Sequence, residues 1–435
     1  MDIARGQTAE GGQRAGKGQT AEGEQMNKGE QMDKMEQVER HIKVLDGVRV
    51  FAIGLVAWFH FWQQSWLTPA IRLPGWVARY TGIQSVNIEG YVRYGFVFVD
   101  MLILLSAFCN FYPYARSILL GEPWPDTKTF YRKRAARILP SYYFSLAAMT
   151  LLGLAEGSVS LDGVFWKDLA AHITCTAPFF ADTYLSRNFS GVLWTLQIEV
   201  LYYVLLPWLA RLFKKAPALL CLGLWGCGIV SANGIAAMGA DRVRVLGNHM
   251  LTFAGCYANG MLLGMLYITL KRGVKENLYT RMAADVTVVG CLFALSHMMK
   301  RMGAGELQIV QLQQRFELSL VFSLFLLAVT FAGKGIRLVF ANKLMVFLAG
   351  ISYNFYIWHQ YIAVWMKNRR IPFWEGDTPP NITGDRVWMW KYQIGIVLVS
   401  LLAAVILTYA LEKPAARLLR KKWTKKTEDR AAKAA

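Results

Sequence analysis

The chain has 435 residues, of which 54% are hydrophobic and only 18% are charged, and its formal net charge is +19. A soluble protein of this size usually carries about a quarter charged residues, so the composition excludes an ordinary soluble domain. The apolar residues also come in runs of about twenty, which is the length that spans a hydrocarbon core. We therefore expect an all-α, polytopic membrane protein whose first partner is the lipid bilayer.

Ten apolar runs predict ten transmembrane helices within one membrane domain, residues 41–417. Residues 1–40 are rich in Gly, Gln, Glu and Lys and have little to bury, so we expect a disordered N-terminal tail. Residues 418–435 form a basic tail. The ten predicted spans are about 48–66, 91–113, 138–155, 191–210, 216–237, 249–270, 283–299, 316–333, 344–366 and 391–411.

The positive charges are distributed unevenly between the loops that alternate across the ten spans. If both termini are cytoplasmic, 33 of the 48 Lys and Arg residues lie inside and 15 lie outside. This is the positive-inside pattern, and it predicts two cytoplasmic ends. The net charge then reflects topology and the attraction of basic tails to anionic lipid, so no nucleic-acid partner is expected. The expected location is the plasma (inner) membrane, which the chain crosses many times.

The cysteines show neither a CxxC motif nor a Cys/His spacing typical of a metal site. Five of the six lie in apolar runs, where a reduced cysteine behaves as a small hydrophobe. We therefore expect no disulfide framework and no bound metal. The six are Cys109, Cys175, Cys221, Cys227, Cys256 and Cys291.

The first span, LDGVRVFAIGLVAWFH, carries two ionisable side chains, Arg49 and His60. They are eleven residues apart, which is close to three helical turns, so both fall on nearly the same face about 16 Å apart. An ionisable residue within a membrane span marks a functional site by default. The alternative is that Arg49 is an interfacial anchor and His60 is a hydrogen-bonded polar residue between helices.

Further ionisable residues lie in four other spans: Asp100, Glu199, His359 and Glu412. Each alone could be a buried polar group that fixes helix packing. Together they suit the transfer of an electrophile to a hydroxyl, because histidine readily takes a hydroxyl proton near neutral pH. A carboxylate such as Glu199 or Asp46 could orient the ring of His60. The sequence has no GxSxG, Gly-rich phosphate loop or HExxH motif, which disfavours hydrolase, P-loop and zincin interpretations.

A basic run precedes the third span on the predicted cytoplasmic side and includes Arg134 and Arg137. Arginine forks match phosphate oxygens, so the run suits a polyanionic donor. The alternative is a plain positive-inside signal.

Six ordered motifs resemble those of the integral-membrane acyltransferase-3 family, which acylates sugars and other hydroxyl acceptors. The resemblance extends from about Leu45 to Arg417, and it is to members without an extracellular esterase-like domain. Ala107 replaces a glycine that is usual in the family, which puts close helix packing there in question, and Thr195 replaces a serine. The motifs are LDGVRVFAIGLVAWFH with Arg49 and His60, VDMLILLSAF with Asp100, RKRAARILPSYY with Arg134 and Arg137, LWTLQIEVLYYVLLP with Trp194, Glu199 and Tyr203, ISYNFYIWH with Ser352, Tyr353 and His359, and LEKP with Glu412 and Pro414.

The resemblance implies an O-acyltransferase that uses acyl-CoA, most often acetyl-CoA, as a cytoplasmic donor. Arg134 and Arg137 would hold the donor's phosphates, and Arg49 would polarise the thioester carbonyl or position the donor. His60 would act as the general base or carry the acyl group transiently, and Glu199 would orient His60 or the acceptor. The acceptor would be a hydroxyl of a sugar or cell-surface glycan. The expected supporting residues are Asp46, Asp100, Trp194, Tyr203, Ser352, Tyr353 and His359.

The alternative function is a transporter or flippase whose charged spans line a passage for a glycan or small solute. Such proteins show internal repeats and helices broken at matched positions in two halves. The two halves of this chain show no convincing repeat. The sequence specifies no oligomeric state.

Overall fold

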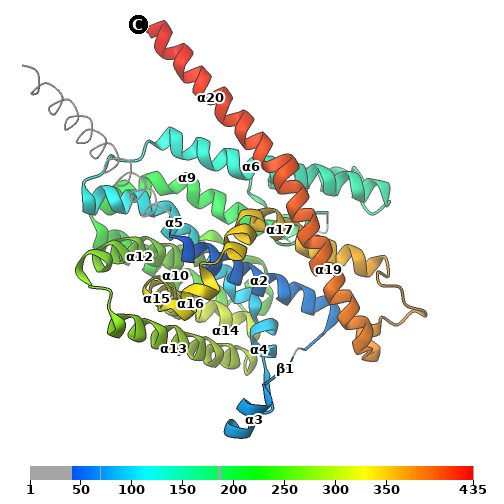
Figure 1. The fold of residues 1–435 in the computed structure, drawn as a ribbon. Helices are drawn as coiled ribbons and strands as arrows, with labels where there is room; N and C mark the ends of the chain where they lie inside the picture. Colours follow the sequence, from blue (N-terminus) through cyan, green and yellow to red (C-terminus); the bar gives the residue numbers. More distant parts are fainter. Residues whose placement is uncertain (1–41, 69, 185–187, 435) are drawn as a thin grey trace, which may run out of the picture.

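A computed structural model describes residues 42–68, 70–184 and 188–434 (Figure 1). The predicted N-terminal tail, residues 1–40, lies outside the described residues. Within the described part of the chain, nine helical segments are long and apolar enough to cross a membrane. Counting one bent helix pair as a single span gives ten. The prediction of an all-α, polytopic membrane protein is confirmed.

The helices follow the order expected from the apolar runs. Those that belong to the predicted spans are α2 (Lys43–Ser65), α5 (Phe98–Leu120), α6 (Thr127–Ala155), α9 (Leu193–Lys215), α10 (Pro217–Ala237), α12 (Ala254–Gly273), α13 (Leu278–Gly303), α15 (Arg315–Phe331), α17 (Lys343–Asn368) and α19 (Arg386–Leu407). The shorter elements are β1 (Ala70–Arg72), α3 (Gly75–Thr81), β2 (Ser85–Asn87), α4 (Glu89–Arg93), η1 (Gly95–Val97), α7 (Gly163–Ile173), η2 (Ala177–Phe179), α8 (Ala181–Tyr184), α11 (Ala240–Leu246), η3 (Met250–Phe253), α14 (Leu307–Gln313), α16 (Lys334–Phe340) and α18 (Pro380–Thr383).

The last span continues beyond the predicted boundary. A π-helical turn, η4 (Thr408–Glu412), joins α19 to α20 (Lys413–Ala434). In Figure 1, α20 projects away from the bundle, whereas the hairpin of β1 and β2 with α3 projects at the other end of the view. The two strands pair antiparallel with Ala70 opposite Asn87.

The predicted eighth span coincides with α15, but α14 precedes it at an angle of 61°. The break places Arg315, the first residue of α15, inside the protein with 3% of its surface exposed. The guanidinium of Arg315 donates to the carbonyl of Gly247 at 2.6 Å and to the hydroxyl of Thr252 at 2.6 Å. The break between the two helices therefore coincides with a buried arginine that is hydrogen-bonded to the segment before α12.

Helices α5 and α12 approach closely at Ala107, where the family usually has glycine. Ala107 is fully buried and faces Gly260 on α12. A Cβ added to Gly260 would lie 2.6 Å from the Cβ of Ala107, which no real pair of side chains tolerates. The close packing questioned from the sequence is therefore present, because the small residue is supplied by the opposite helix.

Candidate active site

Helix α2 carries Arg49 and His60 into two different cavities. We call the first the arginine cavity: a space of about 120 Å³ continuing into a wider one of about 430 Å³, both lined by Arg49, Cys109, Arg134 and Arg137. We call the second the histidine cavity: a space of about 170 Å³ lined by residues that include His60, Asp100, Trp194 and Arg315.

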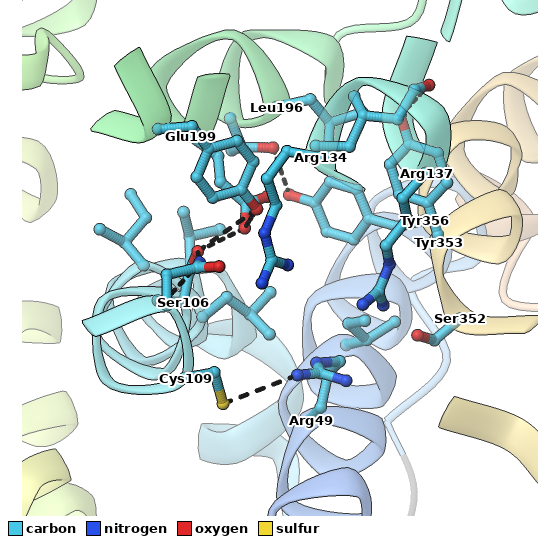
Figure 2. A pocket seen from close by; sticks show the side chains of 18 residues that line it. Arg49, Ser106, Cys109, Arg134, Arg137, Leu196, Glu199, Ser352, Tyr353 and Tyr356 are labelled. Carbon is cyan, nitrogen blue, oxygen red and sulfur yellow. Dashed lines mark hydrogen bonds between the residues drawn. The ribbon is translucent and has the colours of Figure 1, made fainter. Parts of the chain in front are cut away.

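Three arginines from two helices converge on the arginine cavity (Figure 2). Arg134 and Arg137 are one turn apart on α6 and point towards Arg49 on α2. Arg49 lies 3.5 Å from Asp46 and donates to the sulfur of Cys109 at 3.9 Å. Within the described residues, no carboxylate lies within ion-pair distance of Arg134 or Arg137. The cavity therefore holds an excess of positive charge that suits a polyanion.

The carboxylate of Glu199 lies in the arginine cavity and is held by hydroxyl groups. Ser106 donates to its Oε1 at 2.5 Å, and the hydroxyl of Tyr203 donates to the same oxygen. Asn110 donates to the Ser106 hydroxyl at 3.1 Å and so fixes it in turn. Arg134 lies with its guanidinium carbon 5.7 Å from the centre of the Tyr203 ring. Glu199 is thus built into the arginine cavity, away from the ring it was expected to orient.

The residue that contacts His60 is His359 of α17. His60 Nδ1 lies 2.9 Å from His359 Nε2, and His359 Nδ1 lies 2.8 Å from the carbonyl of Tyr356. A carbonyl only accepts, so Nδ1 of His359 carries a proton and Nε2 of a neutral ring is the acceptor. His60 must then donate through Nδ1, which leaves its Nε2 unprotonated. This arrangement is that of a base whose tautomer is fixed by a neighbour.

The expected pairing of His60 with a carboxylate is therefore not the one found. Asp46 pairs with Arg49 and Glu199 with Ser106 and Tyr203, whereas a second histidine orients His60. His359 is fully buried, and its own position is fixed by backbone carbonyls of its helix. The sequence contained both histidines, but they are 299 residues apart, and only tertiary packing brings them together.

Asp100 lines the histidine cavity and pairs with Arg315, a residue that the sequence analysis missed. Arg315 Nε lies 3.4 Å from Asp100 Oδ1, and both side chains are almost fully buried. The Arg315 guanidinium also lies over the ring of Phe253 at 3.9 Å. Each of these two buried charges on the cavity wall therefore has its counter-charge inside the protein. The signal for Arg315 in the sequence was an arginine at the edge of an apolar run.

The remaining supporting residues divide between the two cavities. Trp194 lines the histidine cavity, with its ring stacked 6.1 Å from that of Phe253. Ser352 and Tyr353 line the arginine cavity, where Tyr353 donates to the carbonyl of Ile138 at 3.0 Å. Glu412 lies in neither lining and accepts a hydrogen bond from Asn354 at 2.7 Å.

Comparison with known proteins relates the chain to acyltransferases. The acyltransferase-3 family model, described as an acyltransferase domain, matches residues 42–412. A protein of Acidianus two-tailed virus named as an acetyltransferase, ORF330, is 25% identical over 72% of this chain and 80% of its own length. Nodulation protein 10 of Rhizobium leguminosarum bv. viciae is 28% identical over 42% of this chain and half of its own length. No solved structure matches the chain.

The chain belongs to the acyltransferase-3 family, because the match covers nearly all of its membrane domain. It is an integral-membrane O-acyltransferase.

Proposed function

We propose that this protein transfers an acetyl group from acetyl-CoA, bound from the cytoplasmic side, to a hydroxyl of a sugar or cell-surface glycan. The observation that carries the proposal is the pair of cavities at the two ends of α2. One gathers an excess of positive charge, and the other contains a histidine whose Nε2 is free to accept a proton. A polyanionic donor and a hydroxyl acceptor are the two substrates that such sites suit.

The donor's phosphates and diphosphate would be held by Arg49, Arg134 and Arg137. Charge-assisted hydrogen bonds from guanidinium forks are among the strongest that a protein makes to phosphate. Glu199, hydrogen-bonded to Ser106 and Tyr203, keeps one wall of this cavity polar and ordered. In this arrangement it is a positioning residue for the donor site.

In the reaction, the acceptor hydroxyl oxygen attacks the thioester carbonyl carbon, and the carbon–sulfur bond breaks. His60 Nε2 takes the hydroxyl proton as the oxygen–carbon bond forms, and the departing thiolate of coenzyme A takes up that proton. The products are an acetyl ester and free coenzyme A. His359 stabilises the transient charge on His60 by accepting its Nδ1 proton in a hydrogen bond.

The test is to incubate the purified protein with labelled acetyl-CoA and to follow labelled acetate and acetylated acceptor. Wild-type protein should consume the donor, and His60→Gln and His60→Ala should both lose activity, since a positioned base contributes about 10²–10⁴-fold. Thermal stability should change little in His60→Gln. Full activity of His60→Gln would exclude His60 as the base, and donor that is never consumed would favour the transporter alternative.

A further inference from the structure

The arginine cavity and the histidine cavity share one wall. Among the described residues that line them, Val99 of α5, Thr195 of α9 and Tyr356 of α17 line both. The hydroxyl oxygens of Thr195 and Tyr356 lie 2.9 Å apart and are hydrogen-bonded to each other. The two cavities are therefore separated by a thin layer of side chains from three helices, which we call the septum.

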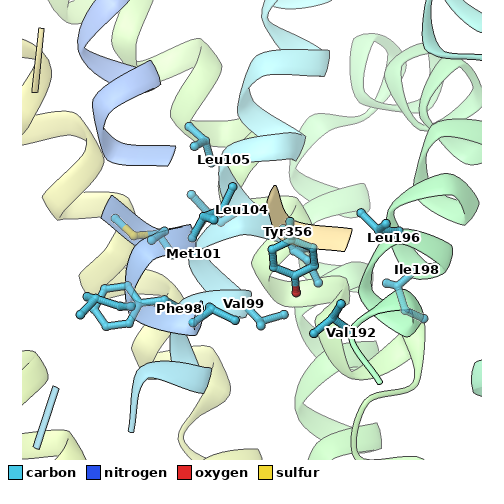
Figure 3. Packing of buried hydrophobic residues seen from close by; sticks show 14 of the residues in the cluster. Phe98, Val99, Met101, Leu104, Leu105, Val192, Leu196, Ile198 and Tyr356 are labelled. Atoms are coloured by element: carbon cyan, nitrogen blue, oxygen red, sulfur yellow. The ribbon is translucent and has the colours of Figure 1, made fainter. Parts of the chain in front are cut away.

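The septum is closed by the Tyr356 ring. In Figure 3 the ring projects from α17 into the space between Val99 and the residues Val192 and Leu196 at the start of α9. Thr195 is anchored on its own side, because its hydroxyl is also hydrogen-bonded to the carbonyl of Val192 at 2.8 Å. All three septum residues are buried, with 4 to 8% of their surface exposed. The contact between Thr195 and Tyr356 therefore stands between the two cavities.

The donor must nevertheless cross this layer if the proposed function is right. Arg49 and His60 lie on one helix, separated by eleven residues or about 16 Å. While the septum is closed, phosphates held by the arginines leave the thioester on the side of the arginine cavity, and the free Nε2 of His60 lies on the other side. The main chain of Tyr356 is fixed, since its carbonyl accepts a hydrogen bond from His359. Its ring packs beside that of His359, with the ring centres 5.5 Å apart, so rotation of the side chain about χ1 would open the septum next to the histidine pair.

We propose that the hydrogen bond between Thr195 and Tyr356 is a gate. When the hydrogen bond is formed, the septum keeps the thioester away from His60 and from water in the histidine cavity. When it is broken, the acyl group can reach His60. The proposal rests on the proposed function. It makes Thr195 and Tyr356 positioning residues that set how often the donor meets His60, and Val99 a residue that limits the size of the acyl group.

The test measures hydrolysis of acetyl-CoA without acceptor, in which water replaces the hydroxyl and the products are acetate and free coenzyme A. Thr195→Val and Tyr356→Phe each remove one hydroxyl and keep the shape. Each should raise the rate of hydrolysis about two- to tenfold, because the loss of one neutral hydrogen bond shifts the equilibrium between the closed and open septum by about that factor. The double variant should exceed neither single variant, because both remove the same bond.

Two comparisons make the result specific. Adding His60→Gln to either gate variant should abolish the excess hydrolysis, because the excess depends on reaching the base. Tyr202→Phe is the matched control: it removes a buried hydroxyl from α9 that is hydrogen-bonded to the Met250 carbonyl and lines neither cavity. Its hydrolysis should equal that of the wild type.

The outcomes separate the gate from the catalytic proposal. Wild-type hydrolysis in stable Thr195→Val and Tyr356→Phe proteins, or an excess that survives His60→Gln, overturns the gate while leaving the base in place. A wild-type protein that never consumes acetyl-CoA overturns the proposed function instead. If either variant fails to fold, Val99→Ala serves instead, because it widens the septum without changing the hydrogen bond between Thr195 and Tyr356. It should raise the turnover of butyryl-CoA relative to that of acetyl-CoA. An unchanged ratio of the two turnover rates contradicts the gate.

Discussion

The histidine pair makes a graded prediction for His359. His359→Leu removes the acceptor for the Nδ1 proton of His60, so the ring of His60 can rotate and its proton can move to Nε2. The loss of the hydrogen bond alone should lower kcat about two- to tenfold, and complete loss of the base should lower it about 10²–10⁴-fold. We expect a fall in kcat between these limits, about 10- to 100-fold. His359→Gln restores an amide oxygen that can accept from His60 and should recover part of the activity.

The assay is acetyl transfer from labelled acetyl-CoA at saturating donor, with thermal stability measured in parallel. Because His359 does not line the arginine cavity, the donor KM should stay close to that of the wild type. The order of activity should be wild type, His359→Gln, His359→Leu and His60→Gln. Equal activity of His359→Leu and wild type, or a His359→Gln protein as inactive as His60→Gln, would refute the tautomer argument.

Arg134→Ala and Arg137→Ala should each raise the donor KM about tenfold or more and leave the acceptor KM unchanged, since a charge-assisted contact is worth about 1.5–3 kcal/mol. Steady-state kinetics with each substrate varied in turn measures both constants. A rise in the acceptor KM instead would mean that the donor does not bind at these arginines. Arg315→Leu should destabilise the protein by about 3–5 kcal/mol because it leaves the buried Asp100 without its counter-charge. Thermal unfolding should show a milder effect when Asp100→Leu is added. Hydrogen bonds from Trp365 and Arg369 hold the pKa of Glu156, just beyond α6, below its ordinary value. Glu156 therefore stabilises the protein at neutral pH and stops doing so as the pH falls through that lowered pKa, so Glu156→Gln should flatten the acid side of the melting-temperature profile; an unchanged profile would count against the contact.

Much of the fold was predictable because a membrane imposes one length scale on the sequence. Each of the ten apolar runs became a helix, since the bilayer requires about twenty apolar residues per crossing. The break before Arg315 was not predicted. The length of an apolar run predicts how far a helix extends. It does not predict that a charged residue at the edge of the run, Arg315, pairs with Asp100 on another helix inside the protein.

Which candidate residues share a cavity was predictable in part, and which of them contact one another was less so. Arg49, Arg134 and Arg137, expected together from the donor they would bind, do line one cavity. Glu199 and His60 do not meet, because position along a span fixes depth in the membrane but leaves open which helices are neighbours. The contact between α2 and α17 that joins the two histidines depends on lateral packing, which the periodicity of a single helix cannot report.

The fit between Ala107 and Gly260 has an evolutionary consequence. The approach of α5 and α12 leaves no room for a side chain at position 260, because an added Cβ would lie 2.4 Å from the main-chain oxygen of Leu104 as well as 2.6 Å from the Cβ of Ala107. Glycine at position 107 would relieve only the second of these contacts. Relatives that keep this approach are therefore expected to keep glycine at the position of Gly260, whether they carry glycine or alanine at the position of Ala107. Since Ser106, the neighbour of Ala107, donates to Glu199, this approach of the two helices also bears on the geometry of the arginine cavity.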